Sequence, residues 1–339
     1  MTARVDELRQ IWQLWYTNDD GRNPFVRTIF TPLFARRTVL NFMIEHFKGK
    51  NGVIFDSGGY YVQQGVVSYE TLFQRLLAFY RGNDWASWYV LPDYVPVTSL
   101  SAGEVQSRVN ATISVARQFA LEMPDGLRSR MLPVVQGHTR EQIKDCVDNY
   151  ADMGATYIGF GSFGTSGDNN SINTVTKQAI QMIEFLKHQA QKYDLKIHLF
   201  GVGTPNVLPL FYELGIDSFD SSCWSRTAGY GNVYLPFIGR KSITQRMARE
   251  IGGVAYTQAR FNELKEATAH NCPFCADFET LKASRIYQMV HNLYVMLDTV
   301  DALNSGKTFI PELIGLEESR YKNYRKQPHV KFNTGSDHE

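Results

Sequence analysis

The sequence lacks the features of a secreted, membrane-bound or disulfide-linked protein. Residues 1–20 mix charged side chains with tryptophans and contain no apolar core of about 7–15 residues, so no secretory signal is predicted. No segment approaches the roughly 18 consecutive apolar residues that a membrane span needs. Four cysteines in 339 residues are too few for a disulfide framework. We therefore expect a soluble chain in a reducing cytoplasm, with no membrane partner.

A strong net charge is also absent. The chain has 35 basic and 34 acidic residues, which gives a formal charge of +1. This balance argues against a partner held by the charge of the whole surface, so any contact with nucleic acid must be local. Two clusters could supply such a contact, although each also fits an ordinary solvated surface or tail: Arg240, Lys241, Arg246 and Arg249, and Arg320, Lys322, Arg325, Lys326 and Lys331.

What is present is an alternation of short apolar runs with helical patterns, which is typical of repeated β-α units. The apolar runs predict strands at residues 53–55, 87–92, 131–135, 155–159, 196–202 and 217–219. Between them, Ser101 with Glu104 and Thr139 with Gln142 fit the capping box that begins a helix. We predict an α/β fold in which the whole chain, residues 1–339, forms one (β/α)8 barrel of the TIM type.

Polar groups and glycines stand where the predicted strands end. A carboxylate, an amide or a glycine closes or follows an apolar run at Asp56, Asp93, Gln136, Gly159 and Asp220. In a β/α barrel the carboxyl ends of the strands share one face, so these groups are expected to meet in one pocket. Carboxylates accept hydrogen bonds from ring N–H groups and amines, so the set suits a planar heterocycle. Each Asp alone fits a helix cap equally well.

Two carboxylates in one pocket suggest a particular reaction. One can act as a nucleophile at an acetal carbon while the other acts as the general acid and base, which gives a double displacement. The glycines after Asp56, at Gly58 and Gly59, would let a ligand approach the backbone closely.

A second cluster lies near the C-terminus. His270, Cys272, Cys275 and His291 place two thiols and two imidazoles within 22 residues, a set that suits tetrahedral, structural zinc. The alternative is buried thiols beside a surface histidine. We expect a zinc-binding subdomain at about residues 255–305, a long helix over 277–303 with Asp277 as its N-cap, and a basic, partly disordered tail at 320–339.

Taken together, these segments resemble the tRNA-guanine transglycosylase superfamily, whose members exchange guanine in a nucleic acid for a 7-deazaguanine. The resemblance runs from about Asp56 to His291, in the family's order. It is carried by Asp-Ser-Gly-Gly-Tyr at 56–60, Val-Val-Gln-Gly at 134–137, Ile-Gly-Phe-Gly-Ser at 158–162, Gly-Val-Gly-Thr-Pro at 201–205 and Gly-Ile-Asp-Ser-Phe-Asp at 215–220. The family also has a Cys3His zinc site near its C-terminus.

The resemblance implies a role for each matched residue. Asp220 would be the nucleophile on C1′ of the target nucleotide, and Asp56 the general acid and base. Asp93 and Gln136, with the backbone at Gly159 and Phe160, would read the base. The remaining substrate-binding residues would be Ser57, Gly58 and Arg226. Zinc would be the structural metal, and no organic cofactor is expected.

The chain also departs from the family's pattern around the segments that face the substrate. His270 stands where the first zinc cysteine is expected, which leaves open whether it is the fourth ligand. The other departures are His138 after Val-Gln-Gly, Tyr60-Tyr61 in place of Phe-Gln, Phe160 in place of a glycine, and Trp224-Ser225 in place of the Pro-Thr before Arg226.

These departures favour the branch of the superfamily that inserts 7-deazaguanines into phage or bacterial DNA, with a base of the preQ0 type as the small partner. The cytoplasm of a bacterium or a phage-infected host would be its setting. Three alternatives stay open: the same exchange in tRNA, a non-catalytic nucleic-acid-binding subunit, and an unrelated barrel hydrolase acting on a nucleoside. A homodimer or accessory proteins are also compatible with the sequence.

Overall fold

The computed structural model describes residues 5–18, 25, 27–50, 52–97, 99–161, 177–244 and 255–307. The predicted tail at 320–339, the second basic cluster, and Arg246 and Arg249 of the first lie outside these residues. No helix within the described ranges is both long and apolar enough to cross a membrane.

Two four-stranded parallel sheets form the centre of the molecule, in the orders β1-β2-β3-β4 and β5-β6-β7-β8. They meet at Pro133, which has no N–H to donate to a ladder and separates β4 from β5. The strands are β1 (Thr28–Phe30), β2 (Val53–Phe55), β3 (Trp88–Val90), β4 (Met131–Leu132), β5 (Val134–Val135), β6 (Tyr157–Phe160), β7 (Lys196–Leu199) and β8 (Ser218–Phe219).

The predicted mixed α/β fold with parallel strands is confirmed. The closed eight-stranded barrel stays a prediction, because β8 and β1 are not paired with each other within the described residues. The strand at 28–30 is absent from the predicted set, and its apolar run is too short to stand out in the sequence.

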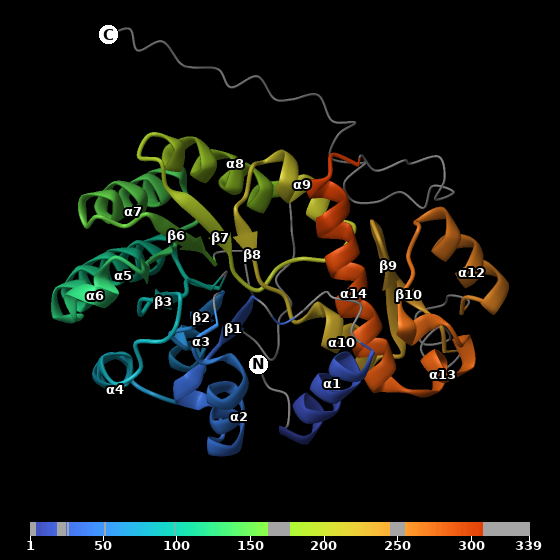
Figure 1. Cartoon of the computed structure of the whole chain (residues 1–339). Coiled ribbons are helices and arrows are strands. Elements are labelled where there is room, and N and C mark those ends of the chain that lie inside the picture. Colours follow the sequence, from blue (N-terminus) through green and yellow to red (C-terminus); the bar gives the residue numbers. More distant parts are fainter. Residues whose placement is uncertain are drawn as a thin grey trace, which may run out of the picture.

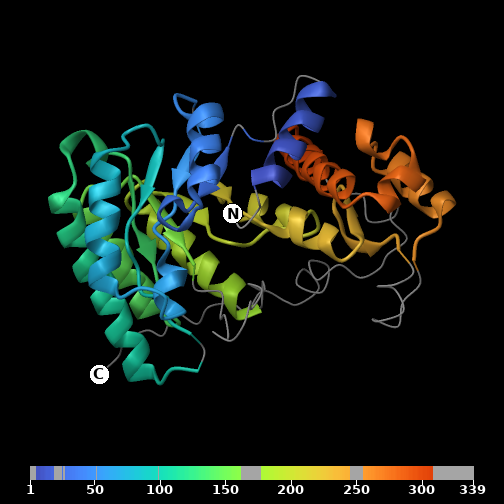
Figure 2. The same ribbon diagram turned by 90° about the horizontal axis from the view of Figure 1, so that it is seen from below.

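Helices cover the outside of the sheets, as Figures 1 and 2 show. Both predicted capping boxes are confirmed, at Ser101 and at Thr139. The helices along this part of the chain are α1 (Val5–Thr17), η1 (Pro32–Phe34), α2 (Arg37–Phe47), α3 (Gly59–Gln63), α4 (Tyr69–Arg81), α5 (Ala102–Glu122), α6 (Asp125–Arg128), α7 (Arg140–Asp152), α8 (Lys177–Gln191), α9 (Leu208–Glu213) and α10 (Cys223–Gly229).

The two faces of the sheets bury different side chains, because successive residues of a strand point to opposite sides. One face packs on the helices in the main core. The other forms a small separate cluster of Val90, Leu132, Val134 and Tyr157, with Trp88 and Phe200 against it. At Gly159 a Cβ would lie 2.1 Å from the Phe200 ring, so only glycine fits this position.

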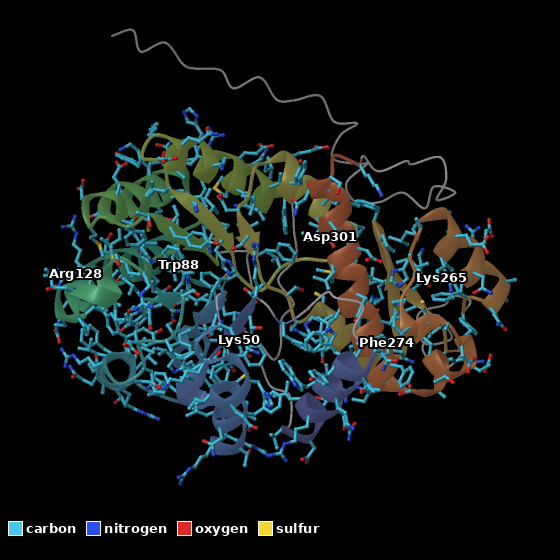
Figure 3. All side chains as sticks on the ribbon, viewed as in Figure 1. Lys50, Trp88, Arg128, Lys265, Phe274 and Asp301 are labelled. Atoms are coloured by element: carbon cyan, nitrogen blue, oxygen red, sulfur yellow. The ribbon has the colours of Figure 1, made fainter. Side chains whose placement is uncertain are left out.

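A smaller unit follows the second sheet and lies to the right in Figure 1. It consists of an antiparallel hairpin, short helices and one long helix that also packs on α10 and α1. Figure 3 places Phe274 beside that long helix and Lys265 on α12. The elements are β9 (Asn232–Leu235), β10 (Ile238–Ser242), α12 (Gln258–Ala267), η2 (Pro273–Cys275), α13 (Phe278–Ala283) and α14 (Arg285–Asn304).

The prediction of one continuous helix over 277–303 is wrong. Asp277 does cap a helix, since its side chain accepts from the Glu279 N–H, but that helix ends at Ala283. Ser284 is extended, and its hydroxyl accepts from the Tyr287 N–H to begin α14. A single residue with helix-capping chemistry thus divides the predicted helix in two.

Candidate functional site

Asp56 begins the candidate site at the end of β2. Its Oδ2 accepts a hydrogen bond of 2.7 Å from the Thr31 hydroxyl, and the residue is partly buried. Burial raises the pKa of this carboxyl, the Thr31 hydrogen bond opposes the rise, and the nearby charge of Asp220 adds to it. A carboxyl with a raised pKa holds its proton more readily, which suits a general acid.

Asp93 lies beside Asp56 at the end of the next strand and is 6% exposed. Gln136 Nε2 donates to its Oδ2 at 2.6 Å, and the Ser57 hydroxyl donates to its Oδ1 at 3.3 Å. Burial raises the pKa of Asp93 to about 7, with a further rise from the charge of Asp56. The structure therefore brings together Asp56, Ser57, Asp93 and Gln136, as expected from the strand ends.

The glycines after Asp56 have steric reasons for their identity. A Cβ on Gly59 would lie 2.5 Å from Asp93 Oδ1, and Gly58 has a φ of +82° with Phe34 equally close. Glycine at 59 lets the loop pass close to the Asp93 carboxylate, and glycine at 58 lets it pass close to Phe34. Gly161 lies beside Gln136, where a Cβ would be 3.5 Å from Gln136 Nε2.

Asp220 follows β8, and its side chain is 22% exposed. Its Oδ1 accepts a hydrogen bond of 2.8 Å from the Gly201 N–H. The same oxygen lies 3.3 Å from Nε2 of His198, a buried residue of β7 that sequence analysis did not single out. A lone histidine in an apolar strand was the available signal, but nothing in the sequence paired it with Asp220.

The remaining predicted site residues are placed differently. The Phe160 side chain is fully buried in the main core, so this replacement of a glycine does not project toward Asp93. The Gly159 N–H donates to the Pro133 carbonyl and the Phe160 carbonyl accepts from the Phe200 N–H, so both groups already serve the sheet. Arg226 is exposed on α10, which begins three residues after Asp220.

The structure also shows what surrounds the residues at two of the departures from the family pattern. Tyr61 stacks on Phe34 with ring centroids 3.8 Å apart, and Tyr60 beside it is 48% exposed. Burial lowers the pKa of His138, and within the described residues its buried Nε2 has no hydrogen-bond partner.

The second predicted cluster forms a compact and fully buried group. Ligand atoms of His270, Cys272, Cys275 and His291 all lie within 4.8 Å of one another. The pairs Cys272 Sγ–Cys275 Sγ, Cys272 Sγ–His291 Nδ1 and His270 Nε2–His291 Nδ1 are each 3.4 Å apart. Tetrahedral zinc with ordinary bond lengths separates its ligand atoms by about 3.3–3.8 Å, so these three separations fit zinc.

Hydrogen bonds on the far side of each imidazole select the nitrogen that faces the group. His270 Nδ1 lies 2.5 Å from Asp298 Oδ2, which leaves Nε2 toward the thiols. His291 Nε2 lies 2.9 Å from the Tyr234 carbonyl, which leaves Nδ1 toward them. Such outer partners orient metal-binding histidines. The group can therefore bind a metal with all four ligands supplied by protein.

Comparison with known proteins gives two findings. A family model described as queuine tRNA-ribosyltransferase matches residues 88–305, well over half of the chain. The match includes Asp93, Gln136, Asp220 and the metal cluster, and begins after Asp56. The tRNA-guanine(15) transglycosylase of Nanoarchaeum equitans (strain Kin4-M) is 46% identical over 44 residues, which is 13% of this chain and 11% of that protein.

Proposed function

The chain belongs to the queuine tRNA-ribosyltransferase family, and we propose that it exchanges guanine in a nucleic acid for a 7-deazaguanine base. The observation that carries the proposal is the pairing of two unlike carboxyls. Asp56 is held toward its protonated form by burial and by the charge of Asp220, whereas Asp220 accepts a hydrogen bond from the Gly201 N–H and lies beside His198 Nε2.

The two carboxyls can perform the exchange in two steps. Asp220 attacks C1′ of the target nucleotide, the bond from C1′ to guanine breaks, and Asp56 gives its proton to the leaving base. The incoming base then attacks C1′, the ester to Asp220 breaks, and Asp56 takes up the proton of the new base. The target nucleotide must leave the base stack for either step to occur.

Asp93 and Gln136 are suited to recognise the base. Their mutual hydrogen bond and the hydroxyl of Ser57 fix the two side chains in one orientation. A carboxyl beside an amide offers acceptors and a donor side by side, which complements the N–H and carbonyl edge of guanine. We propose the same pair for the incoming 7-deazaguanine.

Zinc is proposed as the structural metal. When bound by His270, Cys272, Cys275 and His291 it would tie η2 to α14, and the exchange has no step at the metal. No organic cofactor is needed, because one base replaces another without a change of oxidation state.

DNA is proposed as the polymer, with tRNA as the alternative that the assay must separate. Altered residues around the substrate-facing segments, Tyr60-Tyr61 and Trp224-Ser225, support DNA. The matched family and the relative are both named for tRNA, which supports the alternative.

The exchange is tested by incubating the purified protein with labelled guanine and either duplex DNA or tRNA. We expect label in DNA, and label in tRNA alone would contradict the choice of polymer.

Asp220→Asn should abolish both label uptake and the covalent adduct seen after denaturation. Asp217→Asn, three residues earlier and 34% exposed, is the matched control. Adduct formed by Asp220→Asn would overturn the assignment of the nucleophile.

A further inference from the structure

A hydrogen-bonded chain of four side chains, those of Asp220, His198, Ser218 and Tyr157, extends into the centre of the two sheets. His198 Nε2 lies 3.3 Å from Asp220 Oδ1, and its Nδ1 lies 2.5 Å from the Ser218 hydroxyl. That hydroxyl also contacts the hydroxyl of Tyr157. His198 is 1% exposed and Tyr157 is 7% exposed, so water has little access to this chain.

The hydrogen bonds along this chain have one consistent direction. Burial raises the pKa of Tyr157, so its hydroxyl keeps its proton, and within the described residues its hydrogen-bond partner is Ser218. The Asp220 carboxylate oxygen can only accept, so a neutral His198 that bonds to it carries its proton on Nε2 and accepts at Nδ1 from Ser218. The Ser218 oxygen, with its own proton donated to Nδ1, then accepts from Tyr157. A neutral imidazole that accepts at Nδ1 carries its proton on Nε2, which faces the Asp220 carboxylate.

We propose that His198 is a positioning residue for the nucleophile, locked by Ser218 and Tyr157 in the tautomer that donates to Asp220. This inference rests on the proposed exchange reaction. With the Gly201 N–H and the His198 Nε2–H both on Oδ1, the other oxygen, Oδ2, is the one that we assign to the attack on C1′. The sequence did not single out this residue, and its role follows from the three contacts of this hydrogen-bonded chain together with the Gly201 N–H on Asp220.

The same two donors act in both steps of the exchange. When Oδ2 attacks C1′, Oδ1 becomes the carbonyl oxygen of the ester and its charge falls. When the incoming base attacks C1′, the C1′–Oδ2 bond breaks, its electron pair returns to the carboxylate, and charge returns to Oδ1. Fixed N–H donors at that oxygen stabilise the returning charge without reorganisation. His198 should therefore affect kcat more than the KM for guanine.

The kinetic test compares substitutions at His198 in the polymer that the wild type labels. His198→Phe should lower kcat about 100-fold, the usual effect of removing one fixed donor, with a change in KM below about threefold. His198→Gln, which offers an N–H in its place, should recover at least about tenfold of that loss. A kcat for His198→Phe within about threefold of wild type, or no recovery with Gln, would overturn the proposal.

Two further variants separate positioning from folding. Ser218→Ala keeps the imidazole but removes the donor to Nδ1, and should lower kcat about tenfold. An unchanged kcat in a folded Ser218→Ala protein would contradict the tautomer lock. His46→Gln, at a histidine of α2 packed against Trp12, is the control for loss of an imidazole elsewhere and should leave kcat unchanged.

A measurement without turnover separates this proposal from the proposed function. Nitrogen-15 NMR of the wild type should show His198 with its proton on Nε2, and Asp220→Asn should shift that resonance. A proton on Nδ1 alone would overturn the proposal even if guanine exchange is observed. If neither DNA nor tRNA takes up guanine but NMR places the His198 proton on Nε2, the proposed exchange reaction is refuted. The proposed hydrogen bonds around His198 are then still supported.

Discussion

Asp93 is the carboxyl whose ionisation should most affect the stability of the protein. Its pKa is raised to about 7 by burial, from an ordinary value of 3.8. Because the folded state favours the protonated form, the stability that this form contributes is present at low pH. It is lost as the pH rises through the folded pKa. This contribution to the free energy of unfolding is therefore lost between about pH 4 and about pH 7.

Asp93→Asn should remove this loss, because the amide has the same shape and does not ionise. We expect the free energy of unfolding of the variant, relative to wild type, to rise between pH 5 and pH 8 by on the order of 2 kcal/mol. Urea unfolding at each pH measures the difference. Asp145→Asn, at an exposed carboxyl of α7, should show a constant difference, and parallel curves for Asp93→Asn and wild type would refute the expectation.

The residues around Asp93 show what the sequence could predict at this scale. Polar groups at strand ends predicted that Asp56, Asp93 and Gln136 would meet, because parallel strands bring their carboxyl ends together. His198 was not predicted, since its partners Ser218 and Tyr157 come from other strands and share no motif with it. Pairings of this kind depend on register, which the sequence alone does not reveal.

At the scale of elements, the metal cluster connects three parts of the smaller unit. Cys272 precedes η2 and Cys275 is its last residue, His291 comes from α14, and the Tyr234 carbonyl that orients His291 belongs to β9. Asp298, also on α14, orients His270 at a distance of 2.5 Å. A metal bound here would hold these elements together.

Asp298→Asn should weaken zinc binding about tenfold, because the outer partner of a metal-binding histidine fixes its ring and raises its basicity. Cys272→Ser should lose most of the zinc and lower the melting temperature. Competition with a coloured chelator measures both affinities. Asp301→Asn is the matched control, since Asp301 lies on the same helix and is exposed (Figure 3). Equal zinc affinity of Asp298→Asn and wild type would contradict the role of Asp298.

Local signals in the sequence predicted some elements and missed others for identifiable reasons. Capping boxes fixed the starts of α5 and α7, since side-chain and backbone partners lie within one turn. The hairpin β9–β10 was missed because its turn, Pro236-Phe237, lacks the usual glycine or asparagine, and Phe237 itself has a φ of +63°. Its stability comes from packing on α14, which is distant in sequence.

At the scale of the whole molecule, the near balance of charge limits how nucleic acid can be bound. With a net charge of +1, binding must depend on a few local cations. The structure places Arg240, which is exposed, on β10 at the right of Figure 1, next to Lys241. Burial lowers the pKa of Lys241, and the nearby charge of Arg260 adds to this effect. This hairpin is therefore the candidate for phosphate contact among the described residues.

If β10 contacts the polymer, Arg240→Ala should weaken binding at low salt and reduce the slope of log K against log salt concentration by about one. The effect should be the same for all sequences, because a phosphate contact reads no base. Binding titrations between about 50 and 200 mM salt measure the slope. Lys144→Ala is the control, since Lys144 on the far helix α7 is already paired with Asp148 at 2.6 Å. A slope that is unchanged in Arg240→Ala would place the phosphate contacts elsewhere, because each cation that neutralises a phosphate releases its counterion and must appear in the slope.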